Sequence, residues 1–190
     1  MPYPAQTDRE SIVKIARDAI EQDGIEELSL ARLASKLGIK PPSLYRHIPN
    51  KSALLQAVVV FTFQQLFQAY EVAIQASGGD AKEKLMTIFR THRSFAHANP
   101  ETYVLAFTTT LPEQRANEQM LERLVLPIQE LMATITGSQK SLSALRGALS
   151  LIHGFVMLEL NNQFRRGGDL TEAFEASIET YLLGWQHQEK

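Results

Sequence analysis

The sequence predicts an all-α protein. Apolar residues recur at spacings of three and four along most of the chain, whereas strict alternation of apolar and polar residues is almost absent. Helix start signals, such as Ser, Thr, Asp or Asn before an apolar stripe, alternate with Gly and Pro stop signals. With 190 residues, 44% of them hydrophobic and 21% charged, the chain has enough material for one domain or two small ones.

Four helices are predicted in the N-terminal part. Thr7 and Glu10 form a capping box for the first helix, and Gly24 ends it. A second helix over 29–37 begins at Ser29, and a third over 41–47 opens with two prolines, whose missing N–H groups cost nothing in a first turn. Asn50 then caps a long fourth helix.

The later chain predicts further helices, to a total of about nine. One begins at the capping pattern of Asp80, and another runs from Glu113 towards Ile135 with a kink or break at Pro127. A long helix over about 141–164 is followed by a last one that Thr171 caps and that ends near Trp185. We expect a helix-turn-helix domain over 1–52 and a helical-bundle domain over 53–190.

The charge distribution is asymmetric although the net charge is only −2. No Asp or Glu lies between Leu28 and Tyr70, and the rest of the chain carries all 21 acidic residues. This pattern favours a segment that binds a polyanion, the alternative being a basic surface patch without a partner. The cations of this acid-free segment are Arg32, Lys36, Lys40, Arg46 and Lys51.

Within this segment, the helices over 29–37 and 41–47 form a helix-turn-helix with Gly38 at the turn. Leu44 is expected to face inward. Tyr45, His47 and Lys51 place three hydrogen-bond donors near a helix end, an arrangement suited to holding phosphates.

The stretch from Gly24 to Lys51, GIEELSLARLASKLGIKPPSLYRHIPNK, resembles the DNA-binding domain of the TetR/AcrR family of transcriptional regulators. The resemblance extends from about Thr7 to Val59. More loosely, Ile152-His153-Gly154-Phe155 with Leu158-Glu159 is similar to the Trp-His-Gly signature of one class of TetR ligand-binding domains, with isoleucine in place of the tryptophan. The family implies an all-helical homodimer whose last two helices form the dimer bundle.

The resemblance implies that the start of the third helix enters the major groove of DNA. Arg46 or Lys40 then donates to guanine, Ser43 to several base edges, and the prolines touch a thymine methyl. In this interpretation Ser29, Tyr45, His47 and Lys51 hold phosphates. Alternatively, Tyr45 and His47 serve only packing, and Arg46 is solvated and silent. The candidate DNA-binding residues are Ser29, Lys40, Pro41, Pro42, Ser43, Tyr45, Arg46, His47 and Lys51.

The helix over 141–164 carries two apolar stripes, whereas a surface helix needs only one. Either both stripes are internal, or one packs against a second copy of the chain together with the last helix. The candidate dimer-interface residues are Ala144, Ala148, Leu151, Phe155, Leu158, Phe174, Ile178, Tyr181 and Trp185.

The resemblance also implies a small-molecule cavity in the helices after Gly79. Aromatic and methionine side chains would suit a largely apolar effector, although the same residues also suit a plain core. For His92 and His153 a core role, a ligand contact and metal binding stay open, the last being least favoured. The candidate effector residues are Phe89, His92, Tyr103, Phe107, Met120, Leu124, Met132, His153 and Met157.

Enzyme motifs are absent from the sequence: it has no Gly-rich phosphate loop, no HExxH, no nucleophile elbow and no cysteine. We expect no cofactor, no metal and no catalytic residue. No membrane span and no signal peptide are expected, which favours a cytoplasmic protein. The sequence thus predicts a ligand-responsive regulator, a repressor as is usual in the family, that binds a pseudo-palindromic DNA operator as a homodimer. The alternative is a helical adaptor or small-molecule-binding protein without sequence-specific DNA binding.

Overall fold

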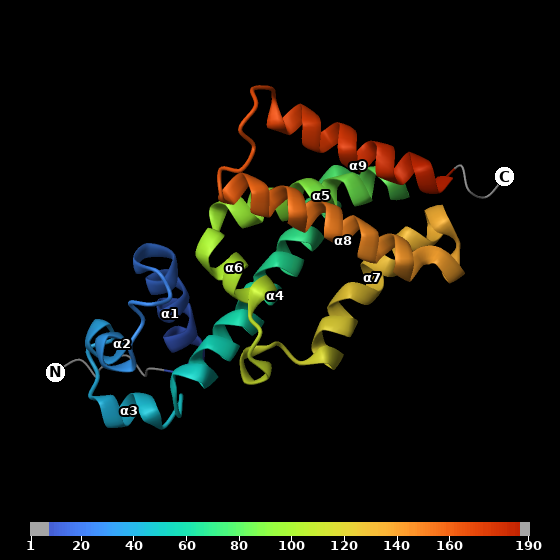
Figure 1. Cartoon of the computed structure of the whole chain (residues 1–190). Coiled ribbons are helices and arrows are strands. Elements are labelled where there is room, and N and C mark those ends of the chain that lie inside the picture. Colours follow the sequence, from blue (N-terminus) through green and yellow to red (C-terminus); the bar gives the residue numbers. More distant parts are fainter. Residues whose placement is uncertain (1–7, 187–190) are drawn as a thin grey trace. The chain divides into compact units, whose positions relative to one another are not determined.

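The computed structural model describes residues 8–186, and within that range every regular element is a helix (Figure 1). The all-α prediction is therefore confirmed. The helices are α1 (Arg9–Asp23), α2 (Leu30–Lys36), α3 (Pro41–Tyr45), α4 (Lys51–Ser77), α5 (Ala81–Ala98), α6 (Pro100–Thr108), the short 3₁₀ turn η1 (Pro112–Gln114), α7 (Glu118–Thr136), α8 (Ser138–Leu160) and α9 (Leu170–Gln186).

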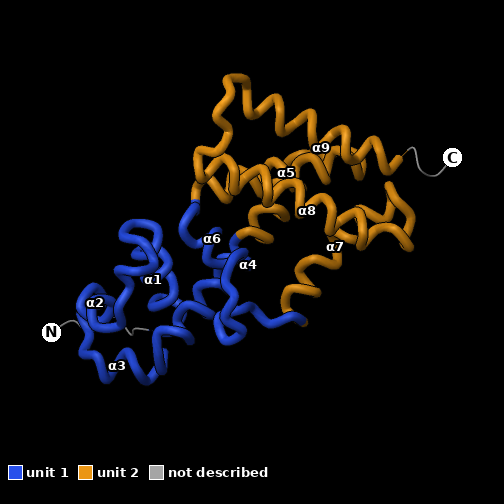
Figure 2. Tube along the Cα trace, in the orientation of Figure 1, with its two compact units in different colours: residues 1–65, 99–118 blue, residues 66–98, 119–190 orange. Residues whose placement is uncertain are grey.

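The chain divides into two compact units (Figure 2). Unit 1 comprises residues 1–65 and 99–118, and unit 2 comprises residues 66–98 and 119–190. The helix α4 is continuous and contributes its first part to unit 1 and its last part to unit 2. Unit 1 thus includes α6 and η1, which lie far along the chain from the other helices of that unit.

Unit 1 is built around a small apolar core. The helix α1 packs on α2 and on α6, and α2 packs on α3. Ile12, Leu33 and Leu44 are each almost fully buried there, as the helical spacing predicts. The predicted cap Thr7 lies outside the described residues. Asp8 is the N-cap of α1, and its carboxylate accepts the backbone N–H of Ser11 at 2.7 Å.

The segment 99–118 is held to the rest of unit 1 at both ends. The carboxylate of Glu21 on α1 accepts the backbone N–H groups of Glu101 at 3.2 Å and Thr102 at 2.9 Å, and the hydroxyl of Thr102 as well. At the other end, the amide of Gln56 on α4 donates to the backbone carbonyl of Arg115 at 3.3 Å. Glu21 therefore satisfies N–H groups at the start of α6 that have no partner within the helix.

In unit 2, α5, α8 and α9 pack on one another. The capping box predicted at Asp80 is present: Glu83 donates its N–H to Asp80 at 2.9 Å, and Asp80 donates its N–H to Glu83 at 3.3 Å. The cap predicted at Thr171 is wrong by two residues. Asp169 accepts the backbone N–H groups of Thr171 and Glu172 at 2.7 and 3.1 Å, because a helix that begins at Leu170 places these N–H groups in its open first turn.

One further prediction differs from the structure. The helix α7 continues through Pro127 without a break and begins later than predicted, after the η1 turn.

Among the described residues, α4 and α8 are long and apolar enough to cross a membrane by length and composition. Core helices of soluble proteins meet the same criteria, so this property is weak evidence for a membrane protein.

Candidate nucleic-acid interface

The helix-turn-helix is formed by α2, the turn at Gly38 and α3, all within unit 1. The hydroxyl of Ser29 caps α2 by accepting the backbone N–H of Arg32 at 3.2 Å. Gly38 has a φ of +64°, a left-handed conformation that favours glycine at this turn. Pro41 and Pro42 form the first turn of α3, as predicted.

The third helix is shorter than predicted and ends at Tyr45 rather than at residue 47. Arg46 and His47 therefore follow the helix end and lead into α4. The backbone N–H groups of His47 and Ile48 both donate to the carbonyl of Leu44, which holds this connection in a fixed turn.

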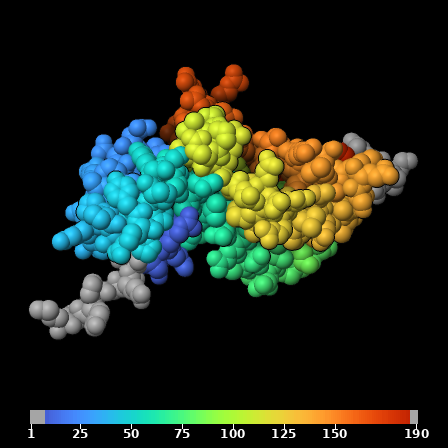
Figure 3. All heavy atoms as spheres, turned by 90° about the horizontal axis from the view of Figure 1, so that it is seen from below, coloured from blue at the N-terminus to red at the C-terminus, as the bar shows by residue number. Residues whose placement is uncertain are grey.

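The predicted DNA-binding residues lie mostly at the surface. Ser29 and Ser43 are half-buried and the other seven are exposed. The light blue and cyan atoms of α3 and the start of α4 are exposed on one face of unit 1 (Figure 3). The exposed residues are Lys40, Pro41, Pro42, Tyr45, Arg46, His47 and Lys51.

Two of the five cations in the acid-free segment are neutralised. Arg32 pairs with Glu27 at 2.5 Å and Lys36 pairs with Asp23 at 3.2 Å. Their acidic partners lie just before the segment and were missed by sequence reasoning, because neither pair has the spacing of a helical i, i+4 contact.

The other three cations of the segment have no acidic partner in the described part of the chain. Lys40 is the N-cap of α3, and Arg46 lies one residue beyond the end of that helix, with a guanidinium nitrogen 3.4 Å from the hydroxyl of Ser43. Lys51 is the first residue of α4, and its ammonium donates to the carbonyl of Ile25 at 3.3 Å. The unneutralised charge therefore lies at α3 and the start of α4.

Asn50 places the start of α4 beside these cations. Its side-chain oxygen accepts the backbone N–H of Ala53 at 2.8 Å, so Asn50 caps α4 as predicted. The remaining N–H groups of the first turn, together with the ammonium of Lys51, make this helix end attractive to an anion.

The predicted effector residues belong to both units. Tyr103 and Phe107 lie on α6 in unit 1, with ring centroids 4.5 Å apart. The other seven belong to unit 2. Phe89, His92 and Met132 are buried there, whereas the rest are half-buried, namely Met120, Leu124, His153 and Met157.

His92 is the buried polar group at the centre of α5. Its Nδ1 lies 2.6 Å from the hydroxyl of Tyr70 on α4, and both side chains are buried. Burial, together with the proximity of His153, lowers the pKa of His92 to about 3, so the imidazole is neutral at physiological pH. Burial also lowers the pKa of His153. Within residues 8–186, no cluster of His, Asp and Glu has the composition of a metal site.

Four of the predicted dimer-interface residues lie inside a single protomer. Ala144 and Ala148 on α8, and Phe174 and Ile178 on α9, are almost fully buried, so they have no surface to offer a partner. Their assignment to a dimer interface stays a prediction, and the exposed area of the protomer does not support it. The other five keep exposed area, namely Leu151, Phe155, Leu158, Tyr181 and Trp185.

Tyr181 has a second role within the protomer. Its hydroxyl donates to the carbonyl of Ala144 at 2.6 Å and lies directly above Gly147. The exposed side of α8 instead presents small residues at spacings of seven and four, a pattern that permits close approach of another helix. These residues are Ser143, Ser150 and Gly154.

Comparison with known proteins places these features in a family. Residues 12–58 match the model described as bacterial regulatory proteins of the tetR family, and residues 85–181 match the model of the tetracyclin repressor-like C-terminal domain. The helix-turn-helix and the cationic start of α4 lie within the first match.

Individual relatives agree along nearly the whole chain. An uncharacterized regulator of the helix-turn-helix type, YobS from Bacillus subtilis (strain 168), is 29% identical over 175 residues, which cover 91% of this chain and 90% of that protein. Another such regulator, Rv0681 from Mycobacterium tuberculosis (strain ATCC 25618 / H37Rv), is 30% identical over 83% of this chain and 72% of its own length.

A solved structure of a protein with unknown function from Rhodococcus sp. RHA1 has the same fold, with a TM-score of 0.80 at 23% identity, over 98% of this chain and 99% of that one. With both of its units matched by family models, the chain belongs to the TetR family of transcriptional regulators.

Proposed function

We propose that this regulator is a cytoplasmic repressor that binds a pseudo-palindromic DNA operator as a homodimer and releases it when a small, largely apolar effector binds. It acts by binding alone and needs no catalytic residue or cofactor. The observation that carries this proposal is the position of Lys40, Arg46 and Lys51, which are exposed around α3 and have no acidic partner among the described residues.

Base and phosphate contacts divide among these residues. Arg46, at the exposed end of α3, can donate two hydrogen bonds to guanine in the major groove. Lys51 has ammonium donors in addition to the one that holds Ile25, and these suit a phosphate. Phosphate contacts fix the position of the protein on the duplex, whereas base contacts select the sequence.

The test is a binding assay with DNA that flanks the protein's own coding region, repeated with unrelated DNA. We expect Lys51→Ala to weaken binding to all sequences alike. Arg46→Ala should mainly relax the preference for the operator, by about 1–3 kcal/mol at one base pair. The double variant Asp23→Ala/Lys36→Ala is the matched control, because it removes a paired cation together with its partner, and it should leave both affinities unchanged.

If Arg46→Ala leaves the sequence preference intact, the assignment of its base contact is wrong. If the unaltered protein ignores every duplex at low salt, the adaptor alternative replaces the proposed function. Both outcomes are read from the same titrations.

Self-association is assigned to α8 and α9. Leu158 on α8 and Leu183 on α9 are large apolar side chains that remain exposed, and the small residues of α8 described above permit close approach of another backbone. Two such helices from each copy form an isologous four-helix interface. Sedimentation equilibrium should therefore show a dimer, and Gly154→Leu should weaken it because the added side chain occupies the approach path.

The effector is assigned to the helices after Gly79, where the match to a tetracyclin repressor-like C-terminal domain supports a small-molecule site. A ligand changes DNA binding only by the difference between its affinities for the two conformations. Screening neutral and charged aromatic compounds by thermal shift, followed by release of bound DNA, tests this assignment. Compounds that stabilise the protein without releasing DNA would contradict it.

A further inference from the structure

A row of ion pairs joins α5 to α9 along one side of unit 2. The ammonium of Lys82 lies 2.9 Å from the carboxylate of Glu179. The guanidinium of Arg90 makes two hydrogen bonds to Glu175, at 2.7 and 2.5 Å. Arg90 follows Lys82 along α5, whereas its partner Glu175 precedes Glu179 along α9. The two helices therefore run antiparallel.

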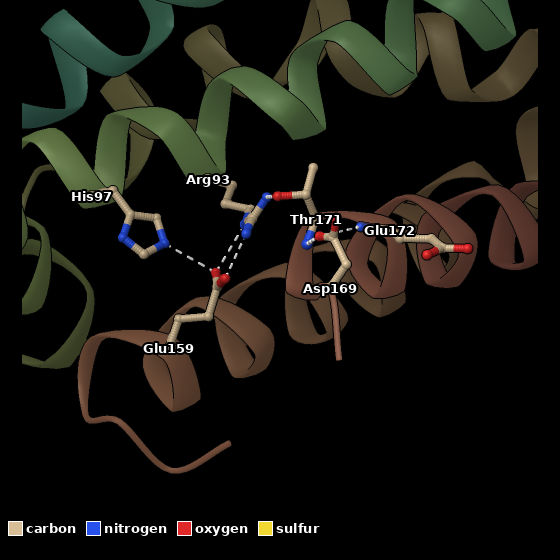
Figure 4. Close-up of polar contacts among 6 residues, drawn as sticks. All are labelled: Arg93, His97, Glu159, Asp169, Thr171 and Glu172. Atoms are coloured by element: carbon tan, nitrogen blue, oxygen red, sulfur yellow. Dashed lines mark hydrogen bonds and ion pairs between the residues drawn. The ribbon is translucent and has the colours of Figure 1, made fainter. Parts of the chain in front are cut away.

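Arg93 continues this row and joins a third helix to it (Figure 4). Its Nε and Nη2 donate to the two carboxylate oxygens of Glu159 on α8, at 2.9 and 2.6 Å, and its Nη1 donates to the hydroxyl of Thr171 on α9 at 3.2 Å. His97 also contacts Glu159, at 3.0 Å. Arg93 and His97 point from α5 towards the same carboxylate in Figure 4.

The surroundings of Arg93 hold its side chain in one place. The Glu159 carboxyl is only 4% exposed, and the guanidinium carbon lies 5.2 Å from the ring centroid of Phe174. A planar guanidinium with two parallel bonds to a carboxylate has little freedom to rotate. Hydrogen bonds from Arg93 and His97 outweigh the effect of burial and lower the pKa of Glu159, so this carboxyl remains charged in neutral solution.

These contacts lie beside the buried apolar side of α9, which Phe174, Ile178 and Leu182 form. Thr171, Glu175 and Glu179 are spaced by four and therefore lie along one side of the helix. With that side turned to α5 and Phe174 turned to the core, a different side of α9 remains exposed. It presents Ala173, Ala176, Thr180, Leu183 and Gly184.

We propose that Lys82, Arg90 and Arg93 are positioning residues for self-association: by fixing the rotation of α9 against α5 and α8, they hold the exposed sides of α8 and α9 in register for a second copy of this chain. The proposal rests on the homodimer of the proposed function. None of the three residues needs to touch the partner copy. Exposed ion pairs contribute little to folding stability, so the effect of these residues is expected in the dissociation constant of the dimer rather than in the free energy of unfolding.

The test measures the dimer dissociation constant by sedimentation equilibrium. Arg90→Glu and Glu175→Arg should each raise this constant about tenfold, which corresponds to about 1.4 kcal/mol. The double swap Arg90→Glu/Glu175→Arg restores the attraction of this pair in reverse and should lower the constant below that of either single variant, although the swapped charges then lie near Glu179 and Arg93. Arg93→Lys keeps the charge but loses the paired bonds to Glu159, so it should also weaken the dimer.

Arg123→Glu is the matched control, because Arg123 is exposed on α7 and, among the described residues, bonds only the carbonyl of Gln119 in its own helix. It should leave the dimer unchanged. Circular dichroism of every variant tests whether the helices are formed. If a single variant loses helicity, the double swap is compared with the unaltered protein instead.

The outcomes separate the two proposals. A monomeric unaltered protein overturns the homodimer itself. A dimeric unaltered protein whose Arg90→Glu and Arg93→Lys variants associate as tightly as the Arg123→Glu control overturns only the positioning role. A folded double swap that associates no more tightly than either single variant also overturns it.

Discussion

His92 shows how one buried side chain makes stability depend on pH. Its pKa is lowered to about 3 by burial and by His153, whereas an unfolded histidine titrates near 6.5. Between these values the unfolded chain binds a proton that the folded chain does not, so the free energy of unfolding falls as pH decreases from 6.5 towards 3. Above pH 6.5 the imidazole of His92 is neutral in both the folded and the unfolded state, so its titration no longer lowers the free energy of unfolding.

We predict that the imidazole of His92 stays neutral at pH 5 in the folded protein. Nitrogen chemical shifts of selectively labelled histidine measure this directly, and the same sample in urea provides the protonated reference. A charged ring at pH 5 in the folded protein would show that water or an anion reaches the side chain.

A second residue, Gly147, controls the distance between α8 and α9. A Cβ at this position would lie 2.3 Å from the hydroxyl of Tyr181, which is itself held by the carbonyl of Ala144. We predict that Gly147→Ala lowers the free energy of unfolding by about 1–3 kcal/mol, the usual cost of overpacking.

Gly154→Ala is the control for Gly147→Ala, since no atom lies within 4 Å of the added Cβ. It should stabilise the same helix by about 0.5–1 kcal/mol. Denaturant titrations of dilute, monomeric protein give both values. Equal effects of the two substitutions would mean that Tyr181 moves aside freely.

At the scale of elements, the N-terminus of α6 depends on a residue of α1. Glu21 accepts two backbone N–H groups and a hydroxyl from the first turn of α6. We predict that Glu21→Ala destabilises unit 1 by about 1–2 kcal/mol, as the loss of a helix cap does. Hydrogen exchange should accelerate first at Glu101 and Thr102.

Glu10→Ala is the matched control, because Glu10 is an exposed glutamate in the first turn of α1, at the other end of that helix from Glu21. It should leave the exchange of Glu101 and Thr102 unchanged. Faster exchange in both variants would assign the effect to general loosening of α1 rather than to the cap.

The sequence predicted where the helices begin better than it predicted which helices pack against one another. Ser29, Asn50 and Asp80 cap the helices that they were expected to cap, because such caps act over three residues. By contrast, helical spacing does not reveal which elements α6 and η1 pack against, although both begin at a proline. No local signal shows that α6 folds against α1.

The same distinction applies to the candidate sites. The exposed cations at α3 follow from composition and a local motif. The neutralisation of Arg32 and Lys36 depends on how a loop folds back, and the burial of Ala144 and Ala148 depends on which side of α8 meets α9. Periodicity identifies two apolar sides of a helix but does not say which of them the same chain covers.

At the scale of the whole molecule, the assembly on DNA should respond to salt in proportion to its unneutralised cations. Each phosphate contact that is lost reduces the salt slope of the binding constant by about 1. In a dimer, Lys51→Ala removes two such contacts, so we predict a slope smaller by about 2.

The matched double substitution Asp23→Ala/Lys36→Ala should leave the slope unchanged, because it removes a paired cation together with its partner. Binding isotherms between low and physiological salt give both slopes. An equal loss in the two variants would mean that the Lys36 pair opens on DNA.

The continuity of α4 has a geometric consequence. At about 1.5 Å per residue, its 27 residues form a rod about 40 Å long. Tilting such a rod by about five degrees at one end displaces the other by about 3.5 Å, close to the 3.4 Å between successive phosphates of one DNA strand. A tilt of α4 by a few degrees is therefore enough to move a side chain that contacts DNA from one nucleotide to the next.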